Sequence, residues 1–223
     1  FQGEKGAYSH IACEEIYKDA EIINCISFEE TFRTAFEDED TKAIIPLENS
    51  LAGRVADIHY LLPKYKLQVY GEHFQKVEHC LLGKQEAELK DIKYVRSHAQ
   101  AIGQCQNVIK KNNFKSIISA DTAGSAKDLA GSGDKSIAAI ASELAAKIYG
   151  LKVLKKNIED ETGNVTRFLI MGKNVRQPEY ENEKKYITTC IFRLKSEPSA
   201  LYKSLGGFAT NQINLTKLES FSV

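Results

Sequence analysis

KYVRSHAQAIGQCQNVIKKNNFKSIISADTAGSAKDLAGSGDKSIAAIASELAAKIYG, residues 93–150, is the stretch that decides the fold class. A short β-branched run, a small polar residue and a segment of helical periodicity follow one another three times within it. The expected strands cover 93–97, 115–120 and 136–141, and the expected helices cover 98–111, 122–130 and 142–149. Strands that alternate with helices form parallel sheets covered by helices, so this stretch predicts an α/β fold.

The alternation continues on both sides of this stretch. Helices are expected at 9–18, 28–37 and 53–65, and β-like runs lie at 21–26, 42–47, 151–157 and 166–172. The run 67–82 is long enough to cross between two lobes. We therefore expect a two-lobed, parallel-sheet α/β domain over 1–172, with lobe 1 at about 1–74 and 157–172 and lobe 2 at about 75–156.

The remainder of the chain predicts a second, smaller domain. Residues 173–185 are polar, contain a proline and carry almost no apolar side chains, which is typical of a linker. Beyond it, 186–196, 199–212 and 213–223 read as strand, helix and strand. The chain starts at Phe1 rather than Met and stops within a β-like pattern, so we expect a piece of a longer protein.

The composition excludes several classes of protein. Thirty Lys and Arg balance thirty Asp and Glu among 223 residues, so no net charge attracts nucleic acid or an anionic membrane. No run approaches the roughly 20 apolar residues of a membrane span, and the first residues lack the apolar core of a signal peptide. The five cysteines form no CxxC pair, which favours reduced thiols and a cytoplasmic location.

Several expected helices begin with small polar residues directly after a strand. These starts are residues 3–9, residues 48–50, Ser97 with His98, Asp121 with Thr122, and Ser142. Each start alone is explained by helix capping. Several helix N-termini at one edge of a parallel sheet favour a cleft that binds carboxylates or phosphates.

Arg167 is a second candidate for anion binding. It follows the hydroxyl of Thr166 and precedes Phe168 on an expected strand, where its guanidinium could clamp a carboxylate. A salt bridge to Glu159 or Asp160 is the alternative. The sequence contains no GxGxxG, P-loop, HExxH or GxSxG motif, and of its five histidines only His98 lies at an expected helix start, where capping is its alternative role. We therefore expect no metal and no cofactor.

Six strings in order resemble the motifs of the prephenate dehydratase family. They are FQGEKGAYSHIA at 1–12, IPLENSLAGRV at 45–55, SHAQAIGQC at 97–105, DTAGSAKDLA at 121–130, AAIASELAAKIYGLKVL at 138–154 and NIEDETGNVTRFLI at 157–170. Residues 186–223 resemble the N-terminal half of an ACT domain, a βαββαβ amino-acid-sensing module. The resemblance implies a catalytic domain like type II periplasmic binding proteins, followed by a truncated ACT domain.

The resemblance also implies a reaction and a set of residues. Prephenate would lose water and carbon dioxide to give phenylpyruvate, without a cofactor, because the aromatising ring accepts the electrons of decarboxylation. By the family's motifs, Thr166 would act on the departing hydroxyl, with Glu48, Asn49 and Gln104 as further catalytic groups. The substrate-binding group would be Arg167, Ser50, Ser97, His98, Thr122 and Phe168, although packing is the simpler role for Phe168.

For the ACT-like segment, the resemblance implies phenylalanine as a possible effector and a homodimer or homotetramer. The regulatory residues would be Ser199, Ala200, Leu201, Glu219 and Ser220. This chain departs from the family's GALV and ESRP strings there, which weakens the expectation of phenylalanine binding. Alternative readings are an arogenate dehydratase, a non-catalytic two-lobed binding protein, and a sensor that acts only through its ACT segment.

Overall fold

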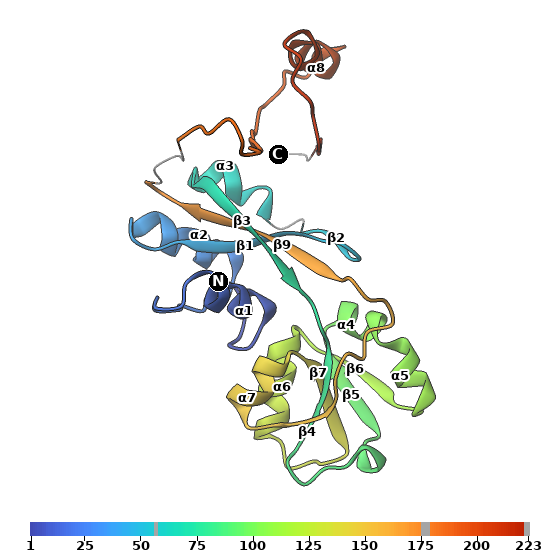
Figure 1. Cartoon of the computed structure of the whole chain (residues 1–223). Helices are drawn as coiled ribbons and strands as arrows, with labels where there is room; N and C mark the ends of the chain where they lie inside the picture. The colour runs from blue at the N-terminus through green and yellow to red at the C-terminus, as the bar shows by residue number, and fades with distance from the viewer. Residues whose placement is uncertain (56–57, 175–178, 221–223) are drawn as a thin grey trace. The chain divides into compact units, whose positions relative to one another are not determined.

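The chain consists of two compact units in a computed structural model that describes residues 1–55, 58–174 and 179–220. The first unit is Phe1–Pro178 and the second is Glu179–Val223 (Figure 1). The boundary lies within the segment 173–185 that the sequence marks as a linker. The first unit is built on two sheets, and the two-lobed α/β fold predicted for it is confirmed.

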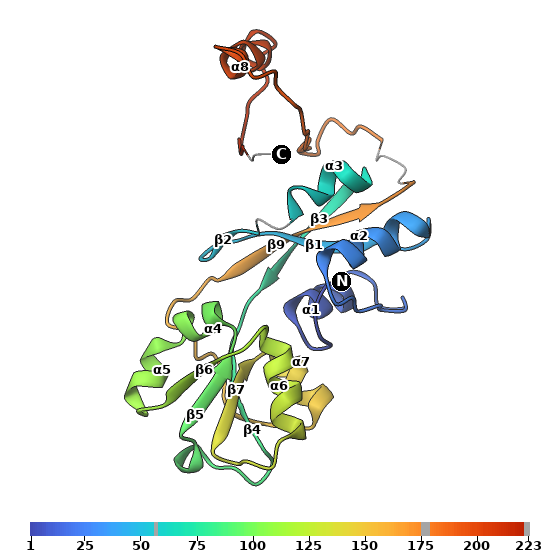
Figure 2. The same ribbon diagram turned by 180° about the vertical axis from the view of Figure 1, so that it is seen from behind.

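Lobe 1 is a four-stranded sheet with helices on both faces. Its strands, in spatial order, are β2 (Gly53–Arg54), β1 (Ala43–Asn49), β9 (Val165–Gly172) and β3 (Gln68–Lys76). Its helices are α1 (Tyr8–Ile16), α2 (Phe28–Glu37) and α3 (Leu61–Tyr65). Strand β9 lies between β1 and β3 and is antiparallel to both, and Figure 2 shows this order from behind.

The side chains of β9 alternate between the two faces of this sheet, as strand geometry requires. Phe168 and Ile170 are buried in a cluster with Ala12 of α1, on one face. Leu169 and Met171 are buried with residues of α2 and α3, on the other face. The same alternation assigns Thr166 to the α1 face and Arg167 to the opposite face.

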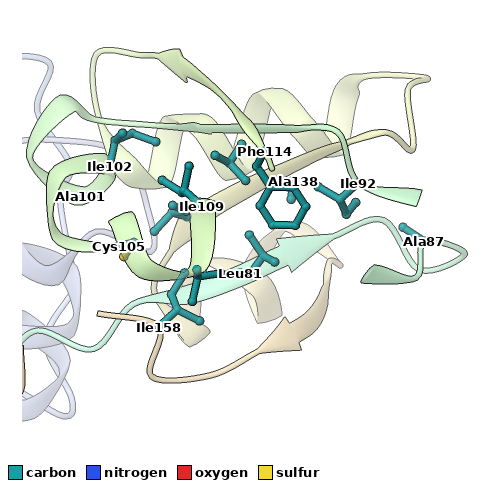
Figure 3. Close-up of a cluster of buried hydrophobic side chains, with 13 residues drawn as sticks. Leu81, Ala87, Ile92, Ala101, Ile102, Cys105, Ile109, Phe114, Ala138 and Ile158 are labelled. Atoms are coloured by element: carbon teal, nitrogen blue, oxygen red, sulfur yellow. The ribbon is translucent and has the colours of Figure 1, made fainter. Parts of the chain in front are cut away.

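Lobe 2 is a five-stranded mixed sheet whose three parallel strands lie on one side. Its strands, in spatial order, are β6 (Lys115–Ile118), β5 (Tyr94–Ser97), β7 (Ile137–Ala141), β4 (Cys80–Gly83) and β8 (Lys152–Lys155). Its helices are α4 (Ala99–Gln104), α5 (Gln106–Lys111), α6 (Thr122–Gly131), α7 (Glu143–Tyr149) and the 3-10 turn η2 (Leu89–Asp91). Figure 3 shows the core between this sheet and α4 and α5, where Leu81, Ile109 and Phe114 pack together.

Some element predictions are corrected by the structure. Among the named strands that the structure describes, β5 is parallel to β6 and β7, and the other pairs are antiparallel. In lobe 1 this is because β9 returns from lobe 2 in the opposite direction to its neighbours. The segment 21–26 contributes only a single bridge, between Gln2 and Cys25. The expected helix 53–65 is β2 followed by α3, with 56–57 outside the described residues, and the expected helix 98–111 is divided at Cys105.

The second unit contains helix α8 (Ala200–Thr210), where a helix was predicted. The two strands predicted on either side of it are absent from 186–196 and from 213–220, and 221–223 lie outside the described residues. A strand is stabilised by hydrogen bonds to a neighbouring strand, and these segments pair with none among residues 179–220. Phe192 nevertheless contacts Phe208 of α8, with ring centroids 6.2 Å apart.

The structure also bears on thiols, metals and membranes. Cys13, Cys25, Cys80 and Cys105 are buried and Cys190 is exposed, all as free thiols. Among the described residues, no group of three or more His, Cys, Asp or Glu side chains is placed to hold a metal ion. Within those same ranges no helix has the length and apolar character needed to span a membrane.

Candidate active site

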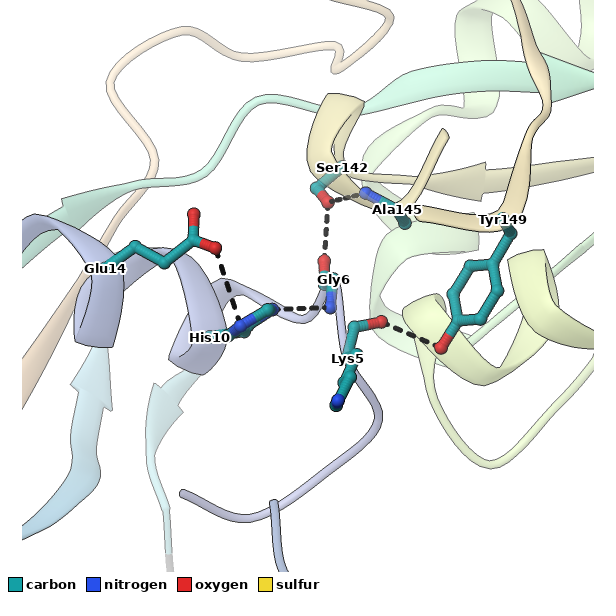
Figure 4. Close-up of polar contacts among 7 residues, drawn as sticks. All are labelled: Lys5, Gly6, His10, Glu14, Ser142, Ala145 and Tyr149. Atoms are coloured by element: carbon teal, nitrogen blue, oxygen red, sulfur yellow. Dashed lines mark hydrogen bonds and ion pairs between the residues drawn. The ribbon is translucent and has the colours of Figure 1, made fainter. Parts of the chain in front are cut away.

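The two lobes meet where the loop 3–7, just before α1, contacts both ends of α7 (Figure 4). Ser142 caps α7 by accepting a hydrogen bond from the Ala145 N–H at 3.0 Å, and its hydroxyl donates to the Gly6 carbonyl oxygen at 2.5 Å. The Tyr149 hydroxyl donates to the Lys5 carbonyl oxygen at 2.9 Å. Gly6 has a φ of +91°, and a Cβ there would lie 2.7 Å from the Ala145 Cα, so only glycine permits this contact.

His10 supports the same loop from α1. Its Nδ1 accepts a hydrogen bond from the Gly6 N–H at 3.0 Å, and its Nε2 lies 3.6 Å from a Glu14 carboxylate oxygen (Figure 4). Burial lowers the pKa of His10 below its ordinary value of 6.5. The neutral form is the one this contact needs, because a protonated Nδ1 could not accept the Gly6 hydrogen bond.

Three helices of lobe 2 begin at one edge of its sheet, as the sequence predicted. The parallel strands β5, β6 and β7 end at residues 97, 118 and 141, and α4, α6 and α7 start at residues 99, 122 and 143. The side chains that cap these helices are His98, Asp121 and Ser142. Each cap occupies one backbone N–H, and the other N–H groups of each first turn keep the positive end of the helix dipole at this edge.

Asn49 links the two strands that carry most of the predicted catalytic residues. It lies opposite Thr166 in the β1–β9 register. Its Nδ2 donates to the Thr166 Oγ1 at 2.9 Å and to the Asn164 Oδ1 at 2.6 Å. Because Thr166 accepts this bond, its own hydroxyl proton remains available for another acceptor, and the accepted bond makes that proton more acidic.

The hydrogen-bonded chain continues from lobe 1 into lobe 2. Asn164 Nδ2 donates to the Gln104 Oε1 at 3.1 Å, and His79 Nε2 lies 3.0 Å from the same oxygen. Tyr8 hydroxyl lies 2.9 Å from the His79 Nδ1. Thr166, Asn49, Asn164, Gln104, His79 and Tyr8 therefore form one continuous network, which we call the amide chain.

A cavity of about 220 Å³ adjoins the amide chain and is lined by Leu51, Gln104 and Glu161. Gln104 is the member of the amide chain that reaches this space. Leu51 follows Asn49 in the turn between β1 and β2, and its backbone N–H donates to the Asn49 Oδ1 at 3.0 Å. The cavity and the amide chain together define the candidate active site.

Arg167 lies on the opposite face of β9 from Thr166. Its guanidinium forms an ion pair with Glu48 at 3.2 Å and with Glu72 at 2.7 Å, and it lies 6.0 Å from the centre of the Phe74 ring. Arg167 was predicted to clamp a substrate carboxylate. Because adjacent residues of a strand point to opposite faces, it lies away from Thr166, and its guanidinium is paired with Glu48 and Glu72 of this chain. The alternative prediction, that Arg167 forms an ion pair within the protein, agrees better with the structure, but the partners are Glu48 and Glu72 and not Glu159 or Asp160.

The other predicted site residues are divided between the site and the scaffold. Ser50 accepts a hydrogen bond from the Val165 N–H at 3.0 Å and holds the turn against β9. Ser97 is fully buried and donates to the Ile140 carbonyl oxygen at 2.6 Å, so its hydroxyl joins β5 to β7. His98 caps α4, and Thr122 is the first residue of α6. Phe168 is 1% exposed and packs within the lobe 1 core.

Sequence reasoning missed three members of the amide chain. Asn164 lies within the quoted string that ends in Thr166, Tyr8 lies in the first string, and His79 lies in the run that crosses between lobes. Among the histidines, His98 was the predicted site residue because it lies at the start of an expected helix. A polar residue at the crossover between two lobes was the signal that could have pointed to His79.

Comparison with known proteins identifies the family. The family model described as prephenate dehydratase matches residues 1–176. The chain belongs to the prephenate dehydratase family. The resemblance of the six strings within residues 1–170 is thereby confirmed.

Relatives and solved structures agree with this assignment. A bifunctional N-acyl-homoserine lactone acylase/prephenate dehydratase from Komagataeibacter europaeus is 41% identical over 99% of this chain and 78% of its own length. Arogenate dehydratase/prephenate dehydratase 2 from Arabidopsis thaliana is 40% identical over 99% of this chain, which spans 57% of that relative. The crystal structure of prephenate dehydratase from Arthrobacter aurescens, in complex with L-Phe, matches with a TM-score of 0.85 at 26% identity, covering 99% of this chain and 75% of that one.

Proposed function

We propose that this chain catalyses the decarboxylating dehydration of prephenate to phenylpyruvate, water and carbon dioxide. The observation that carries the proposal is the 2.9 Å hydrogen bond from Asn49 Nδ2 to Thr166 Oγ1, which leaves the Thr166 hydroxyl as a donor. Membership of the prephenate dehydratase family supports the choice of substrate. The reaction breaks a carbon–oxygen bond, so the enzyme would be a carbon–oxygen lyase.

For this reaction the protein has to position the substrate and to form a hydrogen bond to the leaving hydroxyl group. The electron pair of the bond to the leaving carboxylate forms the new ring double bond, and the ring hydroxyl departs with one proton as water. Thr166 donates a hydrogen bond to that departing oxygen, where negative charge develops. An alcohol is a weak acid, so we assign Thr166 hydrogen bonding rather than complete proton transfer, with the proton drawn finally from solvent.

The carboxylate that is not lost in the reaction requires hydrogen-bond donors in the cavity. Phenylpyruvate keeps the side-chain carboxylate of prephenate, and N–H donors stabilise such a group. Gln104 lines the cavity, and its NH₂ group is the donor we assign to that carboxylate. Arg167 is not assigned this task, since its guanidinium is engaged by Glu48 and Glu72.

A spectrophotometric assay for phenylpyruvate tests the proposal directly. Prephenate is expected to be consumed by this chain without added metal or nucleotide. Arogenate should be tested beside it, because several relatives are named arogenate dehydratases. An N-acyl-homoserine lactone should be included because the Komagataeibacter relative is named for both activities. A chain that acts on arogenate or on the lactone but not on prephenate contradicts the proposal.

We propose further that the second unit is part of an ACT domain and that phenylalanine is its candidate effector. The family resemblance at 186–223 supports this, as does the Arthrobacter aurescens protein, which was solved with L-Phe. Ser199 lies at the N-terminal boundary of α8, and Ala200 and Leu201 are the first residues of that helix. We propose Glu219 and Ser220 as the other side of the effector site, and a homodimer or homotetramer as the assembly.

A further inference from the structure

We propose that His79 is a positioning residue that holds the Gln104 carboxamide with its NH₂ group toward the cavity. The inference rests on the proposed function, in which Gln104 faces the substrate. His79 lies between β3 and β4 at the crossover between the lobes and is 2% exposed. It does not line the cavity, so it acts on the substrate only through Gln104.

The direction of every hydrogen bond in the amide chain is set by backbone groups at one end. The Asn49 Oδ1 accepts from the Leu51 N–H at 3.0 Å and from the Ala52 N–H at 2.9 Å. Backbone N–H groups can only donate, so this atom of Asn49 must be the oxygen. The other end of the Asn49 amide is then the NH₂ group, and it faces Asn164.

The fixed direction passes from residue to residue. Asn164 must present its oxygen to Asn49, at 2.6 Å, and therefore its NH₂ group to Gln104, at 3.1 Å. Gln104 in turn must present Oε1 to Asn164. That oxygen also lies 3.0 Å from the His79 Nε2, so Nε2 must carry a proton for the contact to be attractive.

The surroundings of His79 accommodate this tautomer. With the proton on Nε2, neutral His79 accepts at Nδ1, and the Tyr8 hydroxyl is 2.9 Å away and can donate there. The hydroxyl has a single proton and also donates to the Glu78 carbonyl oxygen at 2.7 Å, so that oxygen and Nδ1 share the proton. Glu159 is the charged group that contacts His79, and it accepts from the backbone N–H at 3.0 Å. Burial lowers the pKa of His79, which favours the neutral ring.

The consequence concerns the far end of the Gln104 amide. The Gln104 Oε1 accepts from two donors, one on Asn164 and one on His79. If the carboxamide rotated by 180°, its NH₂ group would face these two N–H groups, and no acceptor would remain. The Gln104 NH₂ group is thereby left as a donor, on a residue that lines the cavity. A flipped amide would present its carbonyl oxygen to a dianionic substrate and repel it.

Kinetics of His79 variants test the inference. His79→Leu removes the donor, and we expect kcat/KM for prephenate to fall roughly 10- to 100-fold, mainly through KM, as misorientation of a binding group predicts. His79→Gln restores an N–H donor and should recover most of this loss. Cys80→Ala is the matched control, because it changes the buried neighbour without touching Gln104, and kcat/KM should change less than about twofold.

A double-mutant cycle separates positioning from general destabilisation. In a Gln104→Met background, His79→Leu should cause no further loss of kcat/KM, since the group it positions is gone. An additional loss equal to that in the unchanged background would overturn the inference. So would a His79→Leu chain that melts normally and keeps its KM.

Nitrogen-15 NMR provides a readout that needs no turnover. The His79 ring, assigned by its absence in His79→Leu, should be the Nε2–H tautomer at neutral pH, and the Nδ1–H tautomer would overturn the inference. If the unchanged chain fails to convert prephenate, the proposed function fails, whereas the NMR tautomer still decides whether His79 donates to Gln104.

Discussion

The Thr166 hydroxyl receives a hydrogen bond and has its own proton left to give. We expect Thr166→Ala to lower kcat by roughly 10²- to 10⁴-fold, the range typical of a positioned hydrogen-bonding group, while KM changes little. Thr166→Ser should retain more activity than Thr166→Ala, and Thr166→Val, which keeps the shape, should resemble Ala. Steady-state kinetics of the three variants decide this. Equal loss in the Ser and Ala variants would indicate that the methyl group matters instead.

Arg167 stabilises lobe 1 by holding Glu48 and Glu72 on the face away from Thr166. Arg167→Lys keeps one charge but cannot bind both carboxylates with its compact ammonium group. We expect the free energy of unfolding to fall by about 1–2 kcal/mol, with KM for prephenate within about threefold of the unchanged chain. Urea unfolding and kinetics measure the two effects. Unchanged stability combined with a large rise in KM would restore the carboxylate-binding role.

The loop 3–7 and helix α7 form one of the contacts between the two lobes. Gly6→Ala would introduce a Cβ at 2.7 Å from the Ala145 Cα, at a φ of +91°. We expect a loss of about 1–3 kcal/mol in the free energy of unfolding, together with reduced kcat/KM, because the loop and α7 would have to separate. Gly131→Ala is the control, since nothing lies within 4 Å of its position and its stability should be unchanged or slightly higher.

Elements were predictable from the sequence where local periodicity and packing agree. The repeated pattern at 93–150 predicted β5, β6, β7 and their helices, because β5 and β7 are largely buried and α4, α6 and α7 each begin at a side-chain cap. The direction of β9 was not predictable, since an apolar run of this kind can pair with its neighbouring strands in either a parallel or an antiparallel direction. The resemblance supplied Thr166, Asn49 and Gln104. It did not supply His79, whose role depends on a contact between the two lobes and whose signal in the sequence is its place in the run that crosses between them.

The first unit as a whole should lose stability in mild acid. His10 and His79 both have pKa values lowered by burial from 6.5, so the unfolded chain takes up protons at a higher pH than the folded chain. Because the unfolded state then binds more protons, the free energy of unfolding falls as pH drops below about 6.5 and toward the lower folded values. Urea midpoints at pH 7.5 and 5.5 measure this. The difference between the two urea midpoints should be smaller in the His10→Gln variant, because glutamine does not take up a proton in this pH range.

The second unit should bind phenylalanine weakly or not at all in this chain. Its strings at 199–202 and 219–222 depart from the GALV and ESRP strings of the resemblance, and α8 is the regular element of its described residues. We expect calorimetric titration with phenylalanine to give no Kd below about 100 µM. Tighter binding would show that the altered strings still form an effector site.

The central place of β9 in the lobe 1 sheet has a consequence for the order in which the protein folds. Residues 43–76 emerge from the ribosome well before residues 165–172, yet β1 and β3 are joined only through β9. Lobe 2, contained within residues 80–155, has all of its strands by then and can form first. Until β9 is synthesised, β1 and β3 therefore each keep an unpaired edge, so the incomplete lobe 1 can be bound by chaperones or can aggregate. Pulse-labelled hydrogen exchange should find lobe 2 amides protected before those of β1 and β3.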